Sequence, residues 1–262
     1  MQSSTRMHLP GLIGLTVIQL WAAHALAFFP HEYAHSIVAW LLGWKASPID
    51  LDYAHPTPIV LLFQLGINQK VNEAPIFASG HGFDAGIIAA AGMVIGNAIL
   101  SLGLARWGWH RAIAKGMRGW AMLAYWVTAA SVGNLLSYVP LRVFVADGDI
   151  FSVVRGFGVS PWTVLVVLGI PTFAALVWFV LDVAPNSLRK LWPDSTAARI
   201  TMALFTAAFV FGFYGLAGLL EDDPIASTMG RICIFGIAPL VAMIEIALVL
   251  RNPRSAEAAG SA

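Results

Sequence analysis

The sequence predicts an all-α polytopic membrane protein with about six full spans. Of its 262 residues, 58% are hydrophobic and only 11% are charged, and the mean hydropathy is +0.76. That composition is far more apolar than that of an average soluble domain. A helix needs about 20 apolar residues to cross a bilayer. Six stretches approach or exceed that length: 11–29, 83–105, 119–139, 161–183, 198–220 and 231–250.

Composition also limits the partners and the domain organisation. The formal net charge of +1 gives no field that would favour nucleic acid. A single cysteine excludes an internal disulfide. We expect residues 1–252 to form one membrane-embedded domain, followed by a flexible C-terminal tail over 253–262. The lipid bilayer is the expected surrounding, and the sequence leaves the oligomeric state open.

Pro30 directly follows the first apolar stretch, 11–29. Proline disrupts a helix interior and is tolerated at a helix start. The sequence therefore predicts a break at Phe29-Pro30 and a separate short helix from His31 to about Trp44. Whether residues 11–44 cross the membrane once or twice stays open.

Residues 45–82 are too rich in proline and charge for a span. The β-like run 59–63 suggests a small β-hairpin at the membrane surface, whose exposed edge can hold an extended peptide. An ordinary connecting loop fits the same composition equally well.

The second span carries a GxxxG pair, Gly92 and Gly96, followed by Asn97. Small residues at this spacing let another helix approach closely, and an amide can form a hydrogen bond across such a contact. Helix packing is the favoured interpretation over direct participation of these residues at a metal.

Charges in the connections predict the orientation. Lysine and arginine concentrate in 106–118 and 184–199, whereas 221–230 opens with three acidic residues. By the positive-inside rule the C-terminus is expected in the cytoplasm. Loops 45–82, 140–160 and 221–230 then share the opposite side. A single crossing by residues 11–44 would bring His31 and His35 toward loop 140–160.

The chemically distinctive segment is the HExxH motif, His31 to His35. On a helix, residues at i and i+4 lie on one face, so both imidazoles can reach one metal ion. Glu32 would then act as a general base toward a metal-bound water. A charged group at the centre of a membrane helix costs about 2.5 to 3.5 kcal/mol. This cost favours a metal site over a hydrogen-bonded histidine cluster.

A catalytic zinc usually has three protein ligands and one open position. The best candidates for the third ligand are Asp147 and Asp149, which flank Gly148. A helix over 150–157 would need an N-cap, and Asp149 is well placed to be that cap. Asp147 is then left for the metal and is modestly preferred. His24 and His81 are further nitrogen donors.

These motifs resemble the site-2-protease-like family of intramembrane zinc metalloproteases. The resemblance rests on the HExxH in an early membrane segment, the stretch from Ala91-Gly92 to Asn97, and the later pattern Asn134, Pro140, Asp147-Gly148. It implies Zn²⁺ bound by His31, His35 and Asp147, with Asp149 as the competing ligand. It also implies a catalytic Glu32, with Asn134 beside the active site. The implied activity is hydrolysis of peptide bonds in a membrane-protein substrate.

Two other classes of function remain open. A membrane transporter would also place histidine and carboxylate groups inside the membrane, and Glu245 in the last span fits a proton or cation path. A non-catalytic membrane scaffold could retain the same His/Glu/Asp cluster. Zinc bound to the purified protein would favour the protease over the transporter.

Overall fold

The computed structural model describes residues 8–251 and is 79% helical, with no β-strand in that part of the chain. Six helices are long and apolar enough to cross a membrane. This confirms the predicted all-α, multi-pass membrane protein. Two spans are formed largely by single α-helices, α1 (Leu9–Leu41) and α6 (Arg118–Arg142).

The other four spans each contain a π-helical segment, labelled η, where the backbone is wound more loosely. Their parts are α4 (Gly82–Ala91), η1 (Gly92–Ser101) and α5 (Leu102–Ala114); α8 (Pro161–Trp178), η2 (Phe179–Val183) and α9 (Ala184–Leu191); α10 (Thr196–Ala207), η3 (Ala208–Phe213) and α11 (Leu216–Leu219); α12 (Pro224–Ile232), η4 (Cys233–Ile237) and α13 (Ala238–Leu250).

The predicted break at Phe29-Pro30 is wrong, because α1 continues through Pro30 to Leu41. The HExxH motif therefore lies within the first span and not on a separate short helix. Proline is tolerated inside membrane helices when tightly packed neighbours support the local backbone. Here η1 supplies that packing: a Cβ added to Gly96 would lie only 2.6 Å from the Pro30 carbonyl oxygen. Residues 11–44 consequently cross once.

The predicted β-hairpin in residues 45–82 is also wrong. The segment contains two short helices, α2 (Pro58–Phe63) and α3 (Glu73–Ala78), and one isolated antiparallel bridge between Asp52 and Asn68. The run 59–63 that resembled a strand is α2, whose N-cap is Thr57. A threonine cap followed directly by proline is a strong helix start, and it outweighs the strand preference of so short a run.

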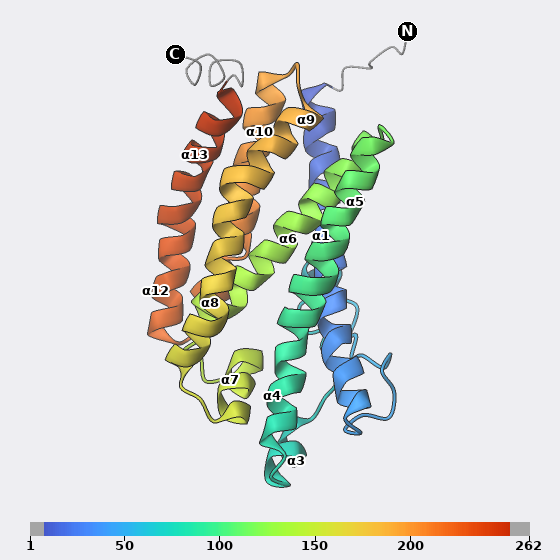
Figure 1. Ribbon diagram of the computed structural model, residues 1–262, viewed down its shortest axis with the longest axis vertical. Helices are drawn as coiled ribbons and strands as arrows, with labels where there is room; N and C mark the ends of the chain where they lie inside the picture. Colours follow the sequence, from blue (N-terminus) through green and yellow to red (C-terminus); the bar gives the residue numbers. More distant parts are fainter. Residues whose placement is uncertain (1–7, 252–262) are drawn as a thin grey trace, which may run out of the picture.

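The connections divide between the two ends of the bundle as the charge pattern predicts (Figure 1). The start of α1, the end of α13, the α5–α6 turn and the α9–α10 turn lie at one end. The opposite end carries α3, the start of α12 and α7 (Gly148–Phe157), a short helix that does not cross the bundle. Loops 45–82, 140–160 and 221–230, which the charge pattern places on one side, therefore begin and end at the same end of the bundle.

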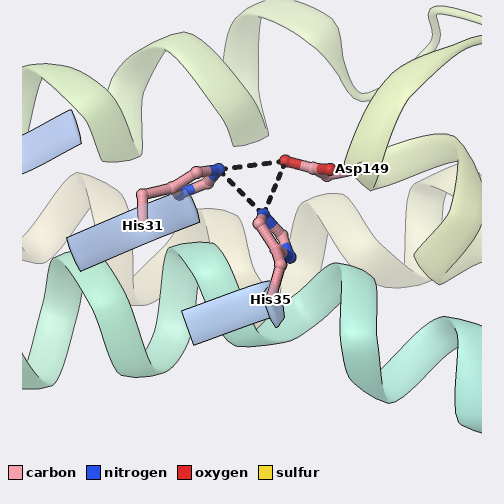
Figure 2. A group of neighbouring side chains, drawn as sticks. All are labelled: His31, His35 and Asp149. Atoms are coloured by element: carbon pink, nitrogen blue, oxygen red, sulfur yellow. Dashed lines mark hydrogen bonds and ion pairs between the residues drawn. The ribbon is translucent and has the colours of Figure 1, made fainter. Parts of the chain in front are cut away.

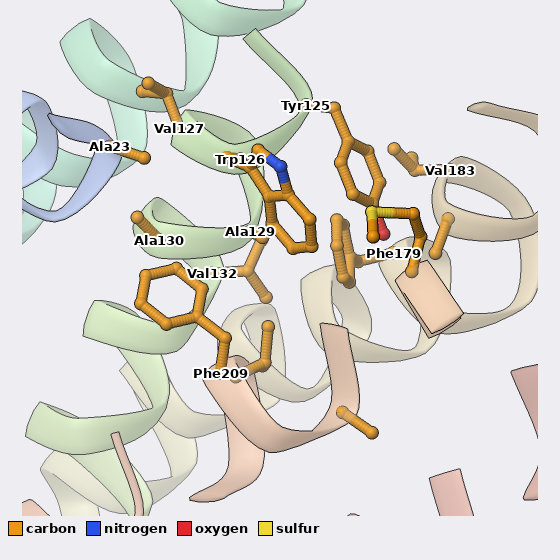
Figure 3. Close-up of a cluster of buried hydrophobic side chains, with 14 of the residues drawn as sticks. Ala23, Tyr125, Trp126, Val127, Ala129, Ala130, Val132, Phe179, Val183 and Phe209 are labelled. Atoms are coloured by element: carbon orange, nitrogen blue, oxygen red, sulfur yellow. The ribbon is translucent and has the colours of Figure 1, made fainter. Parts of the chain in front are cut away.

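The centre of the bundle is α6, which runs obliquely between the other spans (Figure 1) and is the most buried of the six. Tyr125 and Trp126 on this helix are almost completely buried and contact Phe179 and Phe209 from two other spans (Figure 3). Large apolar side chains on the outer helix faces are exposed, as expected of surfaces that contact lipid. The packed centre thus fixes the positions of the outer helices.

Candidate metal centre

α1 places His31 and His35 one helical turn apart, and both side chains are completely or almost completely buried. Their Nε2 atoms lie 3.0 Å from each other. Asp149 Oδ2 lies 3.1 Å from His31 Nε2 and 3.3 Å from His35 Nε2. The three donor atoms therefore form a nearly equilateral triangle (Figure 2).

Gly92 and Gly96 bring η1 into direct contact with the motif. A Cβ at Gly92 would lie 2.2 Å from His35 Nε2, and one at Gly96 would lie 2.5 Å from His31 Cα. No side chain fits at either position. The expected close helix approach is therefore observed, and its partner is the turn of α1 that carries the histidines.

The structure reverses the expected roles of the two aspartates. Asp147 is the N-cap of α7, and its carboxylate accepts a hydrogen bond of 2.7 Å from the Gly148 amide. Asp149 lies in the first turn and reaches both histidines. The helix begins two residues earlier than residues 150–157 suggest, at Gly148, whose φ is +75°. Asp147 is exposed and is not in the three-donor group.

α7 is held against α4 by close backbone packing, so that Asp149 has a fixed position. A Cβ at Gly156 would lie 2.5 Å from the Gly82 carbonyl oxygen and 2.6 Å from the Gly86 amide nitrogen. The Ser152 hydroxyl, one turn after Asp149, donates a short hydrogen bond to the Glu73 carboxylate of α3. The contacts of Gly156 thus connect the third donor to the α4–η1 span that packs on the histidines.

The second nitrogen of each imidazole has its own partner. His35 Nδ1–H donates to the Ile88 carbonyl at 2.6 Å, so that Nε2 is the nitrogen that faces Asp149. The Asn97 amide lies 3.1 Å from His31 Nδ1, so the expected polar contact across the helix pair is present. Partners of this kind fix the orientation and tautomer of histidines that bind metals.

Two residues of α6 complete the wall behind His31. Asn134 is buried, and its amide nitrogen lies 3.5 Å from the Asn97 side-chain oxygen. It thus lies behind the histidines and has no hydrogen bond to either of them. The Tyr138 ring, one turn later, stacks on the His31 imidazole at 4.6 Å between ring centres. Tyr138 was not predicted, although its spacing of four residues from Asn134 places both on one helix face.

Glu32 is buried beside the two histidines on α1. Its Oε2 atom has no hydrogen-bond partner among the described residues. The backbone of Gln69, in the segment between α2 and α3, also approaches this carboxylate. One carboxylate oxygen therefore remains free to accept a proton from a molecule at the site.

The groups around Asp149 favour its deprotonated, carboxylate form. Burial raises the pKa of this carboxyl, but the charge of His35 and hydrogen bonds with both histidines outweigh burial and hold the pKa well below its usual range. Burial raises the pKa of Glu73, an effect that the hydrogen bond from Ser152 partly offsets. A carboxylate must be deprotonated to bind a metal, and Asp149 meets that condition.

The donor set fits a tetrahedral divalent metal. With metal–ligand bonds of about 2.0 Å, ligand atoms in a tetrahedron lie about 3.3 Å apart. The observed separations of 3.0, 3.1 and 3.3 Å are close to that value. His31, His35 and Asp149 can therefore hold a metal ion with a fourth position left open.

The other nitrogen donors considered from the sequence lie outside this group. His24 is bonded to Tyr214 and Phe63, and His81 lies at the start of α4 beside Ser79 and Trp44. Within residues 8–251, the cluster of His31, His35 and Asp149 is the one that can hold a metal.

Comparisons of this chain with protein-family models, with curated proteins and with solved structures found no match.

Proposed function

We propose that this protein is an intramembrane zinc metalloprotease that hydrolyses peptide bonds of membrane-associated proteins. The observation that carries the proposal is the triangle of His31, His35 and Asp149 beside a Glu32 carboxylate with a free oxygen. Two histidines and one carboxylate are a ligand set used by catalytic zinc. The burial of both histidines and Glu32 in a membrane span favours a substrate that reaches the site from the bilayer.

His31, His35 and Asp149 would hold the ion, and their second contacts, to Asn97 and the Ile88 carbonyl, would keep the imidazoles in one orientation. Bound zinc supplies Lewis acidity toward the scissile carbonyl and lowers the pKa of a bound water to about 7. Glu32 accepts a proton from the attacking water and returns it to the leaving amine. The apolar helices around the site exclude bulk water.

The adjacent glutamate supports a hydrolase over a transporter. A transport site requires a group that binds and releases its cargo, whereas Glu32 is buried, lies next to the first ligand in sequence and keeps one oxygen unpaired. The same HExxH spacing supplies two ligands and a base in soluble metalloproteases. Retention of the motif without cleavage would instead support a non-catalytic scaffold.

The proposal is tested by purifying the protein and its Glu32→Gln variant in detergent, loading both with zinc, and measuring cleavage of quenched fluorescent peptides that contain an apolar segment of about 20 residues. We expect Glu32→Gln to retain zinc and to lose at least 100-fold in rate, because removal of a general base costs about 10² to 10⁴-fold. Wild-type cleavage by Glu32→Gln, or no cleavage by zinc-loaded wild type, would contradict it.

A further inference from the structure

α2 lies against the middle of α1, and two α1 side chains hold it there. Trp21 Nε1–H donates to the Leu61 carbonyl at 2.9 Å. His24 Nε2 lies 3.2 Å from the Phe63 carbonyl, and its other nitrogen lies 3.0 Å from the Tyr214 hydroxyl. Within the described residues, the metal cluster does not include His24.

The position of these contacts along α1 places α2 deep in the bilayer. α1 has 33 residues, which corresponds to about 50 Å at 1.5 Å per residue. Trp21 lies about 30 Å from the Leu41 end of the helix and about 18 Å from the Leu9 end. The hydrocarbon layer is about 30 Å thick. With this layer centred on α1, Trp21 lies about 6 Å and His24 about 2 Å from the membrane midplane, whereas His31 lies about 9 Å from it on the Leu41 side.

The side chains of this segment suit such a location. Between His55 and Lys70 the sequence has no charged residue. Large apolar side chains here are 44% to 60% exposed, as expected if they face hydrocarbon: Ile59, Leu61, Leu62, Phe63 and Leu65. The same side chains in water would form a large apolar patch, which soluble surfaces rarely carry.

The backbone contacts meet the main physical requirement of the bilayer. The last carbonyls of a helix lack partners within it, and an unsatisfied carbonyl in hydrocarbon is costly. Trp21 and His24 provide donors to two of the carbonyls at the end of α2, and the Gln64 side-chain amide adds another donor to Leu61. This explains why two polar side chains occur in the middle of an apolar span.

We infer that residues 57–65 are a re-entrant segment embedded in hydrocarbon, and that Trp21 and His24 latch it against α1. The role that we assign to this segment rests on the proposed function. It closes the lipid side of the site to a membrane-embedded substrate. The returning chain passes the site, where the backbone of Gln69 approaches Glu32. A substrate segment that approaches from lipid on this side has to displace the latch.

A cavity of about 400 Å³ separates part of this segment from η3. It is lined by α1, α2 and the α10–η3 span, including His24, Phe63 and Phe213. Because this side of the segment is loosely filled, α2 can shift without collision with the packed centre around α6. The stacked rings of Phe63 and Phe213, with centres 6.1 Å apart, mark where the segment meets η3.

The location is tested without any assay of activity. Leu62→Cys and Ala46→Cys, each in a Cys233→Ala background, are labelled with bimane and reconstituted in phosphatidylcholine vesicles. We expect phospholipids brominated on the acyl chains to quench residue 62, and aqueous iodide to quench residue 46 in the exposed loop after α1. Iodide quenching of residue 62 with no quenching by brominated lipid would overturn the re-entrant location.

The latch is tested with the same label at residue 62. Trp21→Phe combined with His24→Phe keeps apolar bulk and removes both donors. We expect iodide quenching of residue 62 to rise at least threefold, whereas Trp162→Phe, at an exposed site on α8, leaves it unchanged. Unchanged quenching in the double variant would remove Trp21 and His24 as the latch.

The role in substrate entry is tested by a cross-link between Phe63→Cys and Phe213→Cys in the Cys233→Ala background. Oxidation should lower cleavage of the apolar peptide at least tenfold, reduction should restore it, and zinc content should not change. Full-rate cleavage by the cross-linked protein would overturn the gating role. Absence of cleavage by the reduced protein as well would contradict the proposed protease function and leave the two quenching results to decide the location and the latch.

Discussion

Two buried carboxylate sites in this bundle differ in how their polar atoms are satisfied. At the HExxH site, Asp149 and two histidines meet within hydrogen-bond distance, and each imidazole has a second partner. Glu245 in α13 is completely buried, and neither of its oxygens has a hydrogen-bond partner in residues 8–251. The nearby Tyr125 hydroxyl is already bonded to Thr206 at 2.5 Å.

Burial of a polar group in a membrane span therefore does not by itself identify a metal site. Convergence of several donors from different helices is what makes a site able to hold a metal ion. The HExxH site draws its donors from α1 and α7 and their supports from α4 and η1, whereas Glu245 stands alone. If this comparison is correct, changes around the histidines should act on metal binding, and changes at Glu245 should act on stability alone.

The largest effect is expected at Gly92. Valine at this position would put a Cβ 2.2 Å from His35 Nε2, so the histidine or η1 must move. We expect Gly92→Val to lower zinc affinity more than 100-fold and to lower the melting temperature, as overpacked sites do. Gly103→Val on the same span has no heavy atom within 4 Å of the added Cβ and is the matched control. Equal zinc affinity in both variants would contradict a role of the Gly92–His35 contact in metal binding.

A smaller effect on the same site is expected from Asn97. Loss of a partner to a metal-binding histidine typically costs about 10- to 100-fold in metal affinity, and Asn97→Leu should fall in that range. A flip of the Asn97 side-chain amide, which exchanges its nitrogen and oxygen, would let the oxygen accept a hydrogen bond from His31 Nδ1–H. Asn97→Asp keeps that acceptor and should therefore retain near wild-type affinity in a competition titration with a zinc chelator. Equal loss in both variants would mean that Asn97 acts only through packing.

Glu245 provides the contrasting test. A buried polar group without a partner costs about 1 to 3 kcal/mol in mutational data. Glu245→Leu should therefore raise the free energy of unfolding by about 1 kcal/mol, measured by denaturation in mixed micelles. Zinc content should not change, and Glu245→Gln should be close to neutral. Destabilisation by leucine would reveal a partner for Glu245 and favour a proton or cation path there.

The sequence predicts the features that depend on local composition. The spans follow from apolar length, the grouping of loops follows from charge, and the Gly92–Asn97 stretch indicates a close helix contact. Two predictions failed, one because tertiary packing overrides local preference and one because a local helix start was missed. Pro30 lies in a continuous helix because η1 packs against it, and residues 59–63 form a helix because Thr57 and Pro58 start one.

For the site too, the sequence predicts what local periodicity determines and misses what tertiary packing brings together. His31 and His35 are related by helix periodicity alone, so the sequence places them on one face. The choice between Asp147 and Asp149 depends on the residue at which α7 begins, and the helix begins at Gly148, not at residue 150. Tyr138 and the Ile88 carbonyl come from other helices, and no local pattern marks them as neighbours of the histidines.

The most direct test of the account is the zinc content of the purified wild-type protein and of Asp147→Asn and Asp149→Asn. Asparagine caps a helix about as well as aspartate, so Asp147→Asn should keep the wild-type zinc content and melting temperature. Asp149→Asn removes the carboxylate that contacts both histidines and should lose most of the metal. We predict close to one zinc per chain in the wild type and in Asp147→Asn, and little in Asp149→Asn. Full zinc content in Asp149→Asn, or none in the wild type after loading, would contradict the proposed metal centre.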